Sequence, residues 1–319
     1  MKAIVYRKYG PPDVLEYMEI ANLKLKENEV LIRNYATTVT AADCLMRRGD
    51  TIISRIFLGL LKPKRKILGT EIAGEIEKVG KNVKQFKKGD LVYGFTGFRL
   101  GGYAEFTCLP ENASLTEMPS KLKFEEAAAI VDGATTAIYF LKDLVSIKPG
   151  HKVLIIGASG SIGSYAVQIA KYFDAEVTAV CGTSNVKWVK KLGADHVIDY
   201  TQEQLTETGK TFDIIFDTVG KSSFPECQNS LKKQGVYLSA NGRIMDYLFM
   251  ILTKLIGGKK VKCGMSINKL DALRLLKKLV DENKIVPIID RSYPLKEIID
   301  AHRYVETGHK KGNIVIRLV

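Results

Sequence analysis

Residues 152–163 read Lys-Val-Leu-Ile-Ile-Gly-Ala-Ser-Gly-Ser-Ile-Gly, and this stretch decides the fold. Lys152–Ile156 is a short apolar run that predicts a buried strand, and a helical pattern, Ser164–Phe173, follows the glycines. Glycines at such a turn let the backbone approach a pyrophosphate closely, and the helix N-terminus offers N–H groups to its phosphates. The stretch therefore predicts a dinucleotide site formed by Gly157, Ser159, Gly160, Ser161, Ile162 and Gly163.

The spacing G-x-x-G-x-x-G differs from the commoner G-x-G-x-x-G and also occurs at purely structural turns, so its context decides the interpretation. Downstream, short apolar runs alternate with helical patterns, which is typical of repeated βαβ units and a parallel sheet. The expected strands are Glu176–Val180, His196–Ile198, Asp213–Phe216 and Val236–Leu238, and the expected helices between them are Val186–Leu192 and Phe224–Lys232.

The segments on either side predict a second, mostly β domain. Short alternating segments broken by glycine and proline fill the chain up to about Pro119, including Glu29–Arg33, Thr70–Val79 and Asp90–Gly94. The fold class is therefore α/β: residues 1–122, completed by 285–319, form the β domain, and residues 123–284 form a doubly wound parallel-sheet domain. The later segments are an amphipathic Ile244–Ile256, a strand Lys259–Cys263, a helix Lys269–Val280, a strand Ile285–Ile289, a helix Leu295–Val305 and a strand Ile314–Leu318.

Composition limits the class of protein. The 319 residues carry a net charge of +13, but the lysines are scattered among glutamates, which argues against nucleic-acid binding and favours a basic surface that attracts an anionic cofactor. The apolar run Tyr247–Leu252 is far shorter than the roughly 20 residues of a membrane span. With Lys254, Lys259 and Lys260 nearby, the segment Met245–Leu252 could also lie on a membrane surface, but a helix that lines the substrate cleft or forms a dimer contact is the favoured interpretation. The charged start of the chain and five cysteines without a C-x-x-C pair favour the reduced cytoplasm.

The loop after the strand Glu176–Val180 is expected to select the cofactor. An NAD site usually places an acidic residue there, to bind the ribose hydroxyls. Here the loop has no acidic residue but offers hydroxyls, an amide and an ammonium, from Thr183, Ser184, Asn185 and Lys187. These groups suit a 2′-phosphate and favour NADPH, although an ordinary polar loop with a solvated lysine would read the same way.

Motifs along almost the whole chain resemble the medium-chain dehydrogenase/reductase superfamily, in particular its zinc-free quinone oxidoreductase and enone reductase branch. The resemblance implies a GroES-like β domain, a Rossmann domain and an active site in the cleft between them. The motifs are Met1–Val5, Ala36–Asp43 with Gly49, Leu68–Ile76, Val79-Gly80, Lys88–Val92, Gly101–Glu105, Ala127–Ala129, Thr136-Ala137, Leu192–Asp195, Asp199-Tyr200 and Phe216–Gly220.

Two threonines stand where the zinc-dependent relatives hold their catalytic metal. The resemblance places Thr40 at the position of a ligand Cys and Thr70 at that of a ligand His, and Tyr93–Leu100 replaces the lobe that carries four structural cysteines. Losing two of the three protein donors removes the tetrahedral site that zinc needs. We expect no metal.

The resemblance also implies roles for individual residues. Thr40 and Thr136 would lie near the nicotinamide, and Asp43 is either a catalytic acid or a buried structural one. A tyrosine that some relatives use for protonation is Leu45 here. Tyr200 would join the 2′-phosphate loop, Val219 and Ala240 would face the carboxamide, and Asn241 and Asn313 are further candidate contacts.

The expected reaction is hydride transfer from NADPH to a quinone or an α,β-unsaturated carbonyl, whose delocalised product anion needs only hydrogen bonds for support. A homodimer is expected from the resemblance alone. Two alternatives stay open: an alcohol dehydrogenase-like enzyme, and a non-catalytic protein that binds or senses NADPH.

Overall fold

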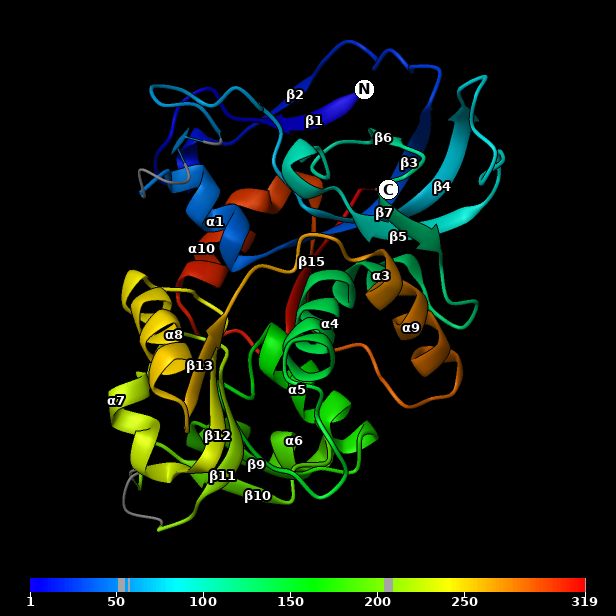
Figure 1. Cartoon of the computed structure of the whole chain (residues 1–319). Helices are drawn as coiled ribbons and strands as arrows, with labels where there is room; N and C mark the ends of the chain where they lie inside the picture. The colour runs from blue at the N-terminus through cyan, green and yellow to red at the C-terminus, as the bar shows by residue number, and fades with distance from the viewer. Residues whose placement is uncertain (51–54, 57, 204–208, 319) are drawn as a thin grey trace. The chain divides into compact units, whose positions relative to one another are not determined.

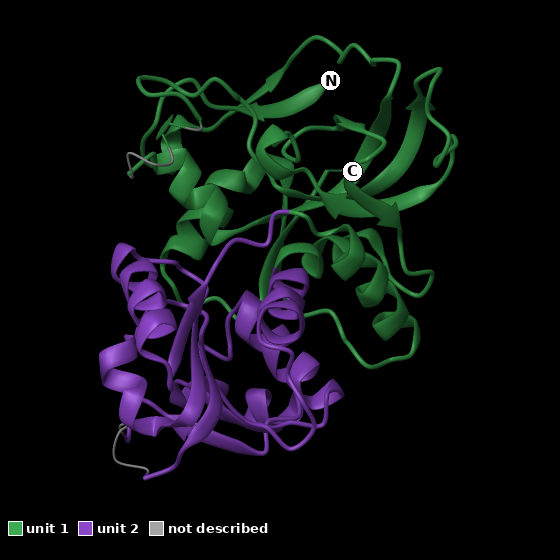
Figure 2. Cartoon of the chain, in the orientation of Figure 1, with its two compact units in different colours: residues 1–132, 268–319 green, residues 133–267 purple. Residues whose placement is uncertain are grey.

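The computed structural model describes residues 1–50, 55–56, 58–203 and 209–318, and Figure 1 shows the course of the chain. The chain forms two compact units: unit 1 comprises Met1–Asp132 and Asn268–Val319, and unit 2 comprises Gly133–Ile267 (Figure 2). The sequence predicts domain bounds at 122/123 and 284/285. The divisions between the units lie about ten and seventeen residues from these positions, so the predicted bounds stay a prediction.

Unit 2 is built on a parallel sheet with the strand order β10-β9-β8-β11-β12-β13. The chain enters the middle of the sheet at β8, moves outward to β10, crosses to the other side of β8 and moves outward again to β13. This is the order of the Rossmann dinucleotide-binding fold, so the predicted fold class is confirmed. The strands are β8 Lys152–Ile156, β9 Glu176–Cys181, β10 His196–Asp199, β11 Phe212–Asp217, β12 Leu231–Ser239 and β13 Lys260–Cys263.

The helices of unit 2 explain why the central strand β8 is almost wholly apolar. Val153, Leu154 and Ile155 of β8 are all fully buried, because a parallel sheet has both faces covered. Residues Gly163 to Ala170 of α5 are buried as well. The helices are α4 Val131–Ile138, α5 Ser161–Tyr172, α6 Val186–Lys191, α7 Phe224–Cys227 and α8 Ile244–Ile256.

Two predicted elements are wrong. The helix expected over Phe224–Lys232 is only α7 and a short turn, because Leu231 already pairs with Phe212 of β11 and is buried in the core. The strand expected over Ile285–Ile289 begins only at Ile289, as β14. Pro287 has no backbone N–H for a ladder, which explains the later start.

Unit 1 is mostly β, as predicted. Its main sheet has the order β14-β15-β3-β4-β5-β7, with β6 paired to β3, and β1 and β2 form a separate antiparallel pair. β15 lies between β14 and β3, so the end of the chain completes the sheet. The strands are β1 Lys2–Val5, β2 Glu16–Glu19, β3 Glu29–Val39, β4 Glu71–Val79, β5 Leu91–Phe95, β6 Phe106–Pro110, β7 Ser114–Glu117, β14 Ile289–Pro294 and β15 Asn313–Arg317; the helices are α1 Ala41–Arg48, α3 Phe124–Ala129, α9 Leu270–Asp281 and α10 Ile298–Glu306.

Within the described ranges, every helix is too short or too polar to cross a bilayer. The five cysteines are all free thiols.

Candidate active site

Two glycines of the turn after β8 are required by the fold itself. Gly157 has a φ of +78°, and a Cβ there would lie 2.6 Å from Val219 Cγ1. A Cβ on Gly163 would lie 2.2 Å from the carbonyl oxygen of Gly157. At both positions the strand, the turn and helix α5 pack so closely that a side chain would clash, so the fold itself requires glycine there.

Packing within the protein does not require glycine at position 160, as expected if the backbone there is kept open for a ligand. The Gly160 φ of −79° suits any residue, and the nearest atom to a Cβ built there is Gly157 O at 3.4 Å. The backbone at Gly160 faces open space directly before the first turn of α5, where helix N–H groups favour anions. A side chain would intrude only on a molecule bound there, so the turn fits the pyrophosphate of a dinucleotide.

Apart from Asn313, the predicted cofactor residues of the later loops follow the carboxyl ends of the parallel strands and therefore share one edge of the sheet. The structure brings several of them together. Val219 packs on Gly157, and Asn241 lies against Gly220, where a Cβ would be 2.2 Å from its Nδ2 atom. Tyr200 lies over Gly182, and Ala240 donates its N–H to the carbonyl of Asp217. Ser159, Ser161 and Ile162 are half-buried at the turn.

Asp217, the last residue of β11, organises the loop that carries Val219, a role that was not predicted from the sequence. One carboxylate oxygen accepts the N–H groups of Val219 at 3.0 Å and Gly220 at 2.8 Å. The other accepts Ser222 N at 2.9 Å and the Tyr237 hydroxyl at 3.2 Å. An aspartate that follows a buried strand and precedes a glycine is a known turn signal that could have revealed this.

The loop expected to bind the 2′-phosphate has an acidic neighbour that was also missed. Thr183 and Ser184 are exposed, as is Lys187, while Asn185 is half-buried with its side-chain oxygen enclosed. Asp199, at the end of β10, pairs in register with Cys181 and so lies next to this loop. A hydrogen bond from the Thr183 hydroxyl lowers the pKa of Asp199, which keeps the carboxyl ionised. The loop therefore combines exposed hydroxyl and ammonium groups, of the kind that suit a phosphate, with one nearby negative charge.

In unit 1, Thr40 and Asp43 form the N-terminal cap of helix α1. The Thr40 hydroxyl accepts Asp43 N at 3.0 Å and donates to Asp43 Oδ2 at 2.6 Å. Asp43 also accepts Thr40 N at 2.9 Å and Gly69 N at 3.2 Å. The Asp43 side chain is fully buried, and burial raises its pKa to about 6 despite these hydrogen bonds. The spacing Thr-x-x-Asp is a capping-box signal, so this contact could have been predicted.

Next to this cap lies a second buried carboxyl. Thr70 is almost buried, and Glu71 is fully buried with its carboxylate accepting from the Thr38 hydroxyl and the backbone N–H of Asp132. Burial and the neighbouring charge of Asp132 raise the pKa of Glu71 to about 8. Burial also lowers the pKa of Lys310 to about 8, and the charge of Glu71 opposes that shift.

A buried thiol and imidazole lie together in unit 1 but do not form a reactive pair. Cys44 Sγ is 3.3 Å from His302 Nδ1. Burial raises the pKa of Cys44 to about 12 and lowers that of His302 to about 3, so both groups stay neutral. Among the residues that the structure describes, no three His, Cys, Asp or Glu side chains are grouped to hold a metal.

Two remaining candidates lie in different units. Thr136 is nearly buried on α4 of unit 2. Asn313 starts β15 in unit 1, where it is buried and donates its side-chain amide to Ile288 O at 2.9 Å. That bond ties β15 to the loop before β14.

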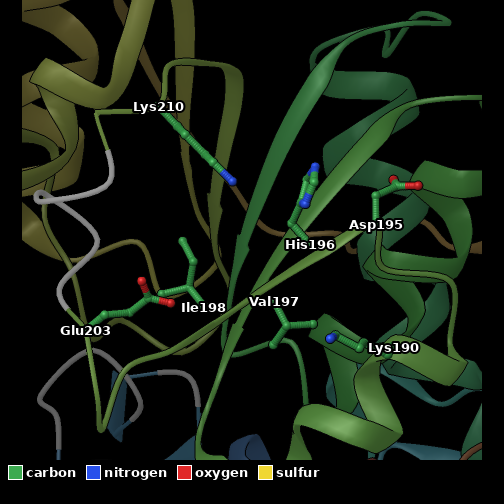
Figure 3. Close-up of a pocket in the computed structure, with 7 residues that line it drawn as sticks. All are labelled: Lys190, Asp195, His196, Val197, Ile198, Glu203 and Lys210. Atoms are coloured by element: carbon green, nitrogen blue, oxygen red, sulfur yellow. The ribbon is translucent and has the colours of Figure 1, made fainter.

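A surface pocket of about 400 Å³ lies along the outer strand β10 (Figure 3). Its lining carries charges of both signs, and it contains none of the predicted cofactor residues. The lining is Lys190, Asp195, His196, Val197, Ile198, Glu203 and Lys210. Asp195 is already bound to Lys171, 2.9 Å away, so this pocket contributes nothing to the predicted site.

Comparisons with known proteins extend over both units. Residues 26–120 match the family model described as alcohol dehydrogenase GroES-like domain, and residues 192–316 match the model described as zinc-binding dehydrogenase. Both threonines at the expected metal positions, Thr40 and Thr70, lie within the first match.

Individual proteins match nearly end to end. The chain is 31% identical over 335 residues to the chloroplast envelope quinone oxidoreductase homolog of Arabidopsis thaliana, covering 99% of this chain and 98% of that protein. It is 29% identical to the chloroplastic NADPH-dependent alkenal/one oxidoreductase of the same plant, covering 99% and 79%. The solved quinone oxidoreductase from Coxiella burnetii superposes with a TM-score of 0.91 at 28% identity, covering 100% and 99%.

Proposed function

Because the chain belongs to the zinc-free quinone oxidoreductase branch of the medium-chain dehydrogenase/reductase superfamily, we propose that it reduces quinones or α,β-unsaturated carbonyls at the expense of NADPH. It is an oxidoreductase of the nicotinamide-dependent kind. The specific acceptor and the choice of NADPH over NADH belong to the proposal.

The observation that carries the proposal is the glycine turn at the switch point of the unit 2 sheet. Strands β8 and β11 are neighbours there, and the chain leaves them in opposite directions across the sheet. Dinucleotides bind at such points. The fold does not require glycine at position 160, and its absent side chain supports the approach of a pyrophosphate to the backbone. When bound, NADPH would supply the hydride.

The donor set in unit 1 supports acceptors that need little polarisation. Threonine hydroxyls at positions 40 and 70 are poor zinc ligands compared with the Cys and His of the zinc-dependent relatives. A simple ketone needs several kcal/mol of polarisation from such a metal. A quinone or enone instead forms a delocalised anion, which a few hydrogen bonds stabilise.

The Thr40–Asp43 pair can supply such a hydrogen bond in one protonation state. While Asp43 is ionised, the only hydrogen of the Thr40 hydroxyl is held by Asp43 Oδ2. When Asp43 is protonated, its own O–H can donate to Thr40, which frees the threonine hydrogen for a substrate oxygen. In this proposal Asp43 positions Thr40 and sets its donor direction, and Thr136 contacts the cofactor.

Several features support NADPH over NADH. The loop after β9 has no acidic residue of its own, and Thr183, Ser184 and Lys187 are exposed around it. Asp199 opposes this preference, because its negative charge lies beside Thr183. We propose that the phosphate-binding groups outweigh it. A homodimer in the reducing cytoplasm completes the proposal and is consistent with five free thiols.

The deciding experiment is a steady-state assay of quinones, enones, enals and simple alcohols or ketones with both nicotinamides. We expect turnover of the first three classes with NADPH preferred, and no turnover of alcohols or ketones. Bound zinc in equal molar amount, together with alcohol oxidation, would favour an alcohol dehydrogenase. Tight NADPH binding without turnover of any acceptor would favour a sensor protein.

A further inference from the structure

A short turn in unit 1 displays two leucines to solvent between buried anchors. Leu60 is 63% and Leu61 is 93% exposed, whereas Leu58, Gly59 and Pro63 are buried. Two adjacent aliphatic side chains with such exposure form an apolar surface that gains free energy when a partner covers it.

The backbone of this turn is firmly held, so the leucines do not protrude for lack of structure. Lys64 N donates to Leu58 O at 2.7 Å, and the Tyr9 hydroxyl donates to Gly59 O at 2.6 Å. Gly59 has a φ of +125°, and a Cβ there would lie 2.2 Å from Lys62 O. The fold therefore requires glycine at position 59 and holds the backbone on both sides of Leu60 and Leu61.

Cations surround the same turn. Arg7, Lys62, Lys64 and Lys66 line a pocket of about 380 Å³ together with Pro63, and the described lining contains no acidic residue. Arg65 is exposed beside it. In the part of the chain that the structure describes, Arg7 has an acidic neighbour, Glu16, 3.9 Å away between two largely exposed side chains. For Lys62, Lys64, Arg65 and Lys66 no acidic partner is found there.

We propose that this basic–leucine turn, residues 60–66 with Arg7, docks the protein on a lipid bilayer that contains anionic phospholipids. Leu60 and Leu61 enter the boundary between headgroups and acyl chains, and the cations meet the lipid phosphates. Peripheral membrane binding needs two signals, an apolar insertion and an electrostatic attraction, and the turn provides both within seven consecutive residues. The net charge of +13 adds long-range attraction to such a surface.

Other occupants fit less well. A two-fold contact with a second copy would set five cations against the same five cations. A nucleic acid is bound by aromatic stacking or by phosphate contacts, and residues 60–66 contain no aromatic side chain while the leucines would stay in water. A free phosphate ion would use the pocket but would leave Leu60 and Leu61 without a role.

The test is cosedimentation of the purified protein with vesicles. We expect binding to phosphatidylcholine vesicles that contain about one-third phosphatidylglycerol, a loss of that binding at high salt, and little binding to pure phosphatidylcholine. Lys62→Ala with Lys64→Ala should weaken binding about 25-fold, at about fivefold for each cation. Leu60→Ser with Leu61→Ser should weaken it about tenfold while leaving the charge unchanged.

Matched controls separate this site from general basicity. Lys24→Ala with Lys26→Ala removes two exposed charges elsewhere in unit 1 and should leave vesicle binding within about twofold of wild type. All three double variants should keep the circular dichroism spectrum and the turnover of a water-soluble quinone. If that turnover is absent in wild type as well, the proposed function fails while vesicle binding still tests the turn.

Three results would overturn the proposal. The first is wild-type binding that does not differ between anionic and neutral vesicles. The second is a leucine variant that binds like wild type while millimolar inorganic phosphate displaces the protein, which would indicate a simple anion pocket. The third is duplex DNA binding that needs the same lysines and exceeds vesicle binding, which would indicate a nucleic-acid surface.

Discussion

The hydroxyl of Thr40 gives its single hydrogen to Asp43 Oδ2 across 2.6 Å, and it accepts the backbone N–H of Asp43 in return. A hydroxyl held in this way can accept a hydrogen bond from a substrate but cannot donate one. Burial raises the pKa of Asp43 to about 6, so its protonation, which reverses this direction, falls near neutral pH.

The first prediction concerns the pH dependence that follows from this contact. Enone reduction should slow as the pH rises from 5 to 8, because Asp43 ionises and withdraws the Thr40 hydrogen. Thr40→Ser should keep the rate and the slope. Thr40→Val should lower kcat about 100-fold, the usual effect of removing an oxyanion donor, and flatten the profile. A wild-type kcat that is constant over this range would contradict the role given to Asp43.

The second prediction separates the two kinds of glycine in the turn after β8. Gly160→Ala should leave the free energy of unfolding within about 0.5 kcal/mol of wild type, since its Cβ meets no atom closer than 3.4 Å. It should weaken NADPH at least tenfold, by about 1.4 kcal/mol, measured by calorimetric titration. Gly163→Ala is the control: its Cβ would lie 2.2 Å from Gly157 O and should cost about 1 to 3 kcal/mol of stability in urea. Unchanged NADPH affinity in Gly160→Ala would mean that the pyrophosphate does not bind at this turn.

The third prediction concerns Lys187, which is exposed in the first turn of α6, directly after the loop that follows β9. Lys187→Ala should weaken NADPH about tenfold and NADH less than twofold, because the ammonium would contact only the 2′-phosphate. The dissociation constants of NADPH and NADH, measured for wild type and variant, give the ratio of the two losses. Lys191→Ala, at an exposed lysine farther along α6, is the matched control. Equal losses of NADPH and NADH affinity in Lys187→Ala would contradict a contact between Lys187 and the 2′-phosphate.

The fourth prediction is a substitution that should increase, rather than decrease, the preference for NADPH. Asp199→Asn should raise the affinity for NADPH about three- to tenfold relative to NADH, because it removes a negative charge beside Thr183 while keeping an oxygen that can accept its hydroxyl. The same titrations apply, at low ionic strength where the charge effect is largest. A ratio shifted toward NADH would show that Asp199 supports NADPH indirectly, by holding the loop in place.

The fifth prediction concerns stability. Burial and Asp132 raise the pKa of Glu71 from 4.5 to about 8, so the folded state holds this proton more tightly than the unfolded state does. The stability that the neutral carboxyl contributes is fully present below pH 4.5 and is lost as the pH rises to about 8.

Glu71→Gln lacks this titration, so its free energy of unfolding should exceed that of wild type by about 2 kcal/mol or more at pH 9, with a smaller difference at pH 5. Urea denaturation at both pH values measures the difference. Glu77→Gln, on the same strand with a side chain that is 34% exposed, should show no such change. A Glu71→Gln variant that loses stability as wild type does between these values would contradict the assignment.

Much of the fold could be predicted because several parallel strands are short apolar runs, and glycine directly follows β8 and β9. Lys152–Ile156 was predicted with its true bounds for this reason. β14, with the sequence Ile-Asp-Arg-Ser-Tyr-Pro, was missed because an edge strand that pairs only with β15 needs no continuous apolar run. Leu231 was assigned to a helix because its pairing with Phe212 is a long-range contact without a local pattern.

The parts of the candidate site that could be predicted are those whose residues lie close together in the sequence. The glycine turn and the Thr40–Asp43 spacing are visible within a few residues. The contact between Asp199 and Thr183 joins positions sixteen residues apart and exists only because β10 lies beside β9, so it requires the strand order. The same holds for the packing of Val219 on Gly157, which needs β11 beside β8.

The place of β15 in the unit 1 sheet has a consequence for biosynthesis. Its buried residues Ile314 to Ile316 fill the position between β14 and β3, yet a ribosome delivers them only after all of unit 2. The strands of unit 2 are contiguous in the chain, so unit 2 can fold during translation while Ala36–Val39 of β3 still wait for β15; β6 already covers the other half of that edge. During translation the chain can therefore hold a complete unit 2 while the unit 1 sheet still lacks β14 and β15.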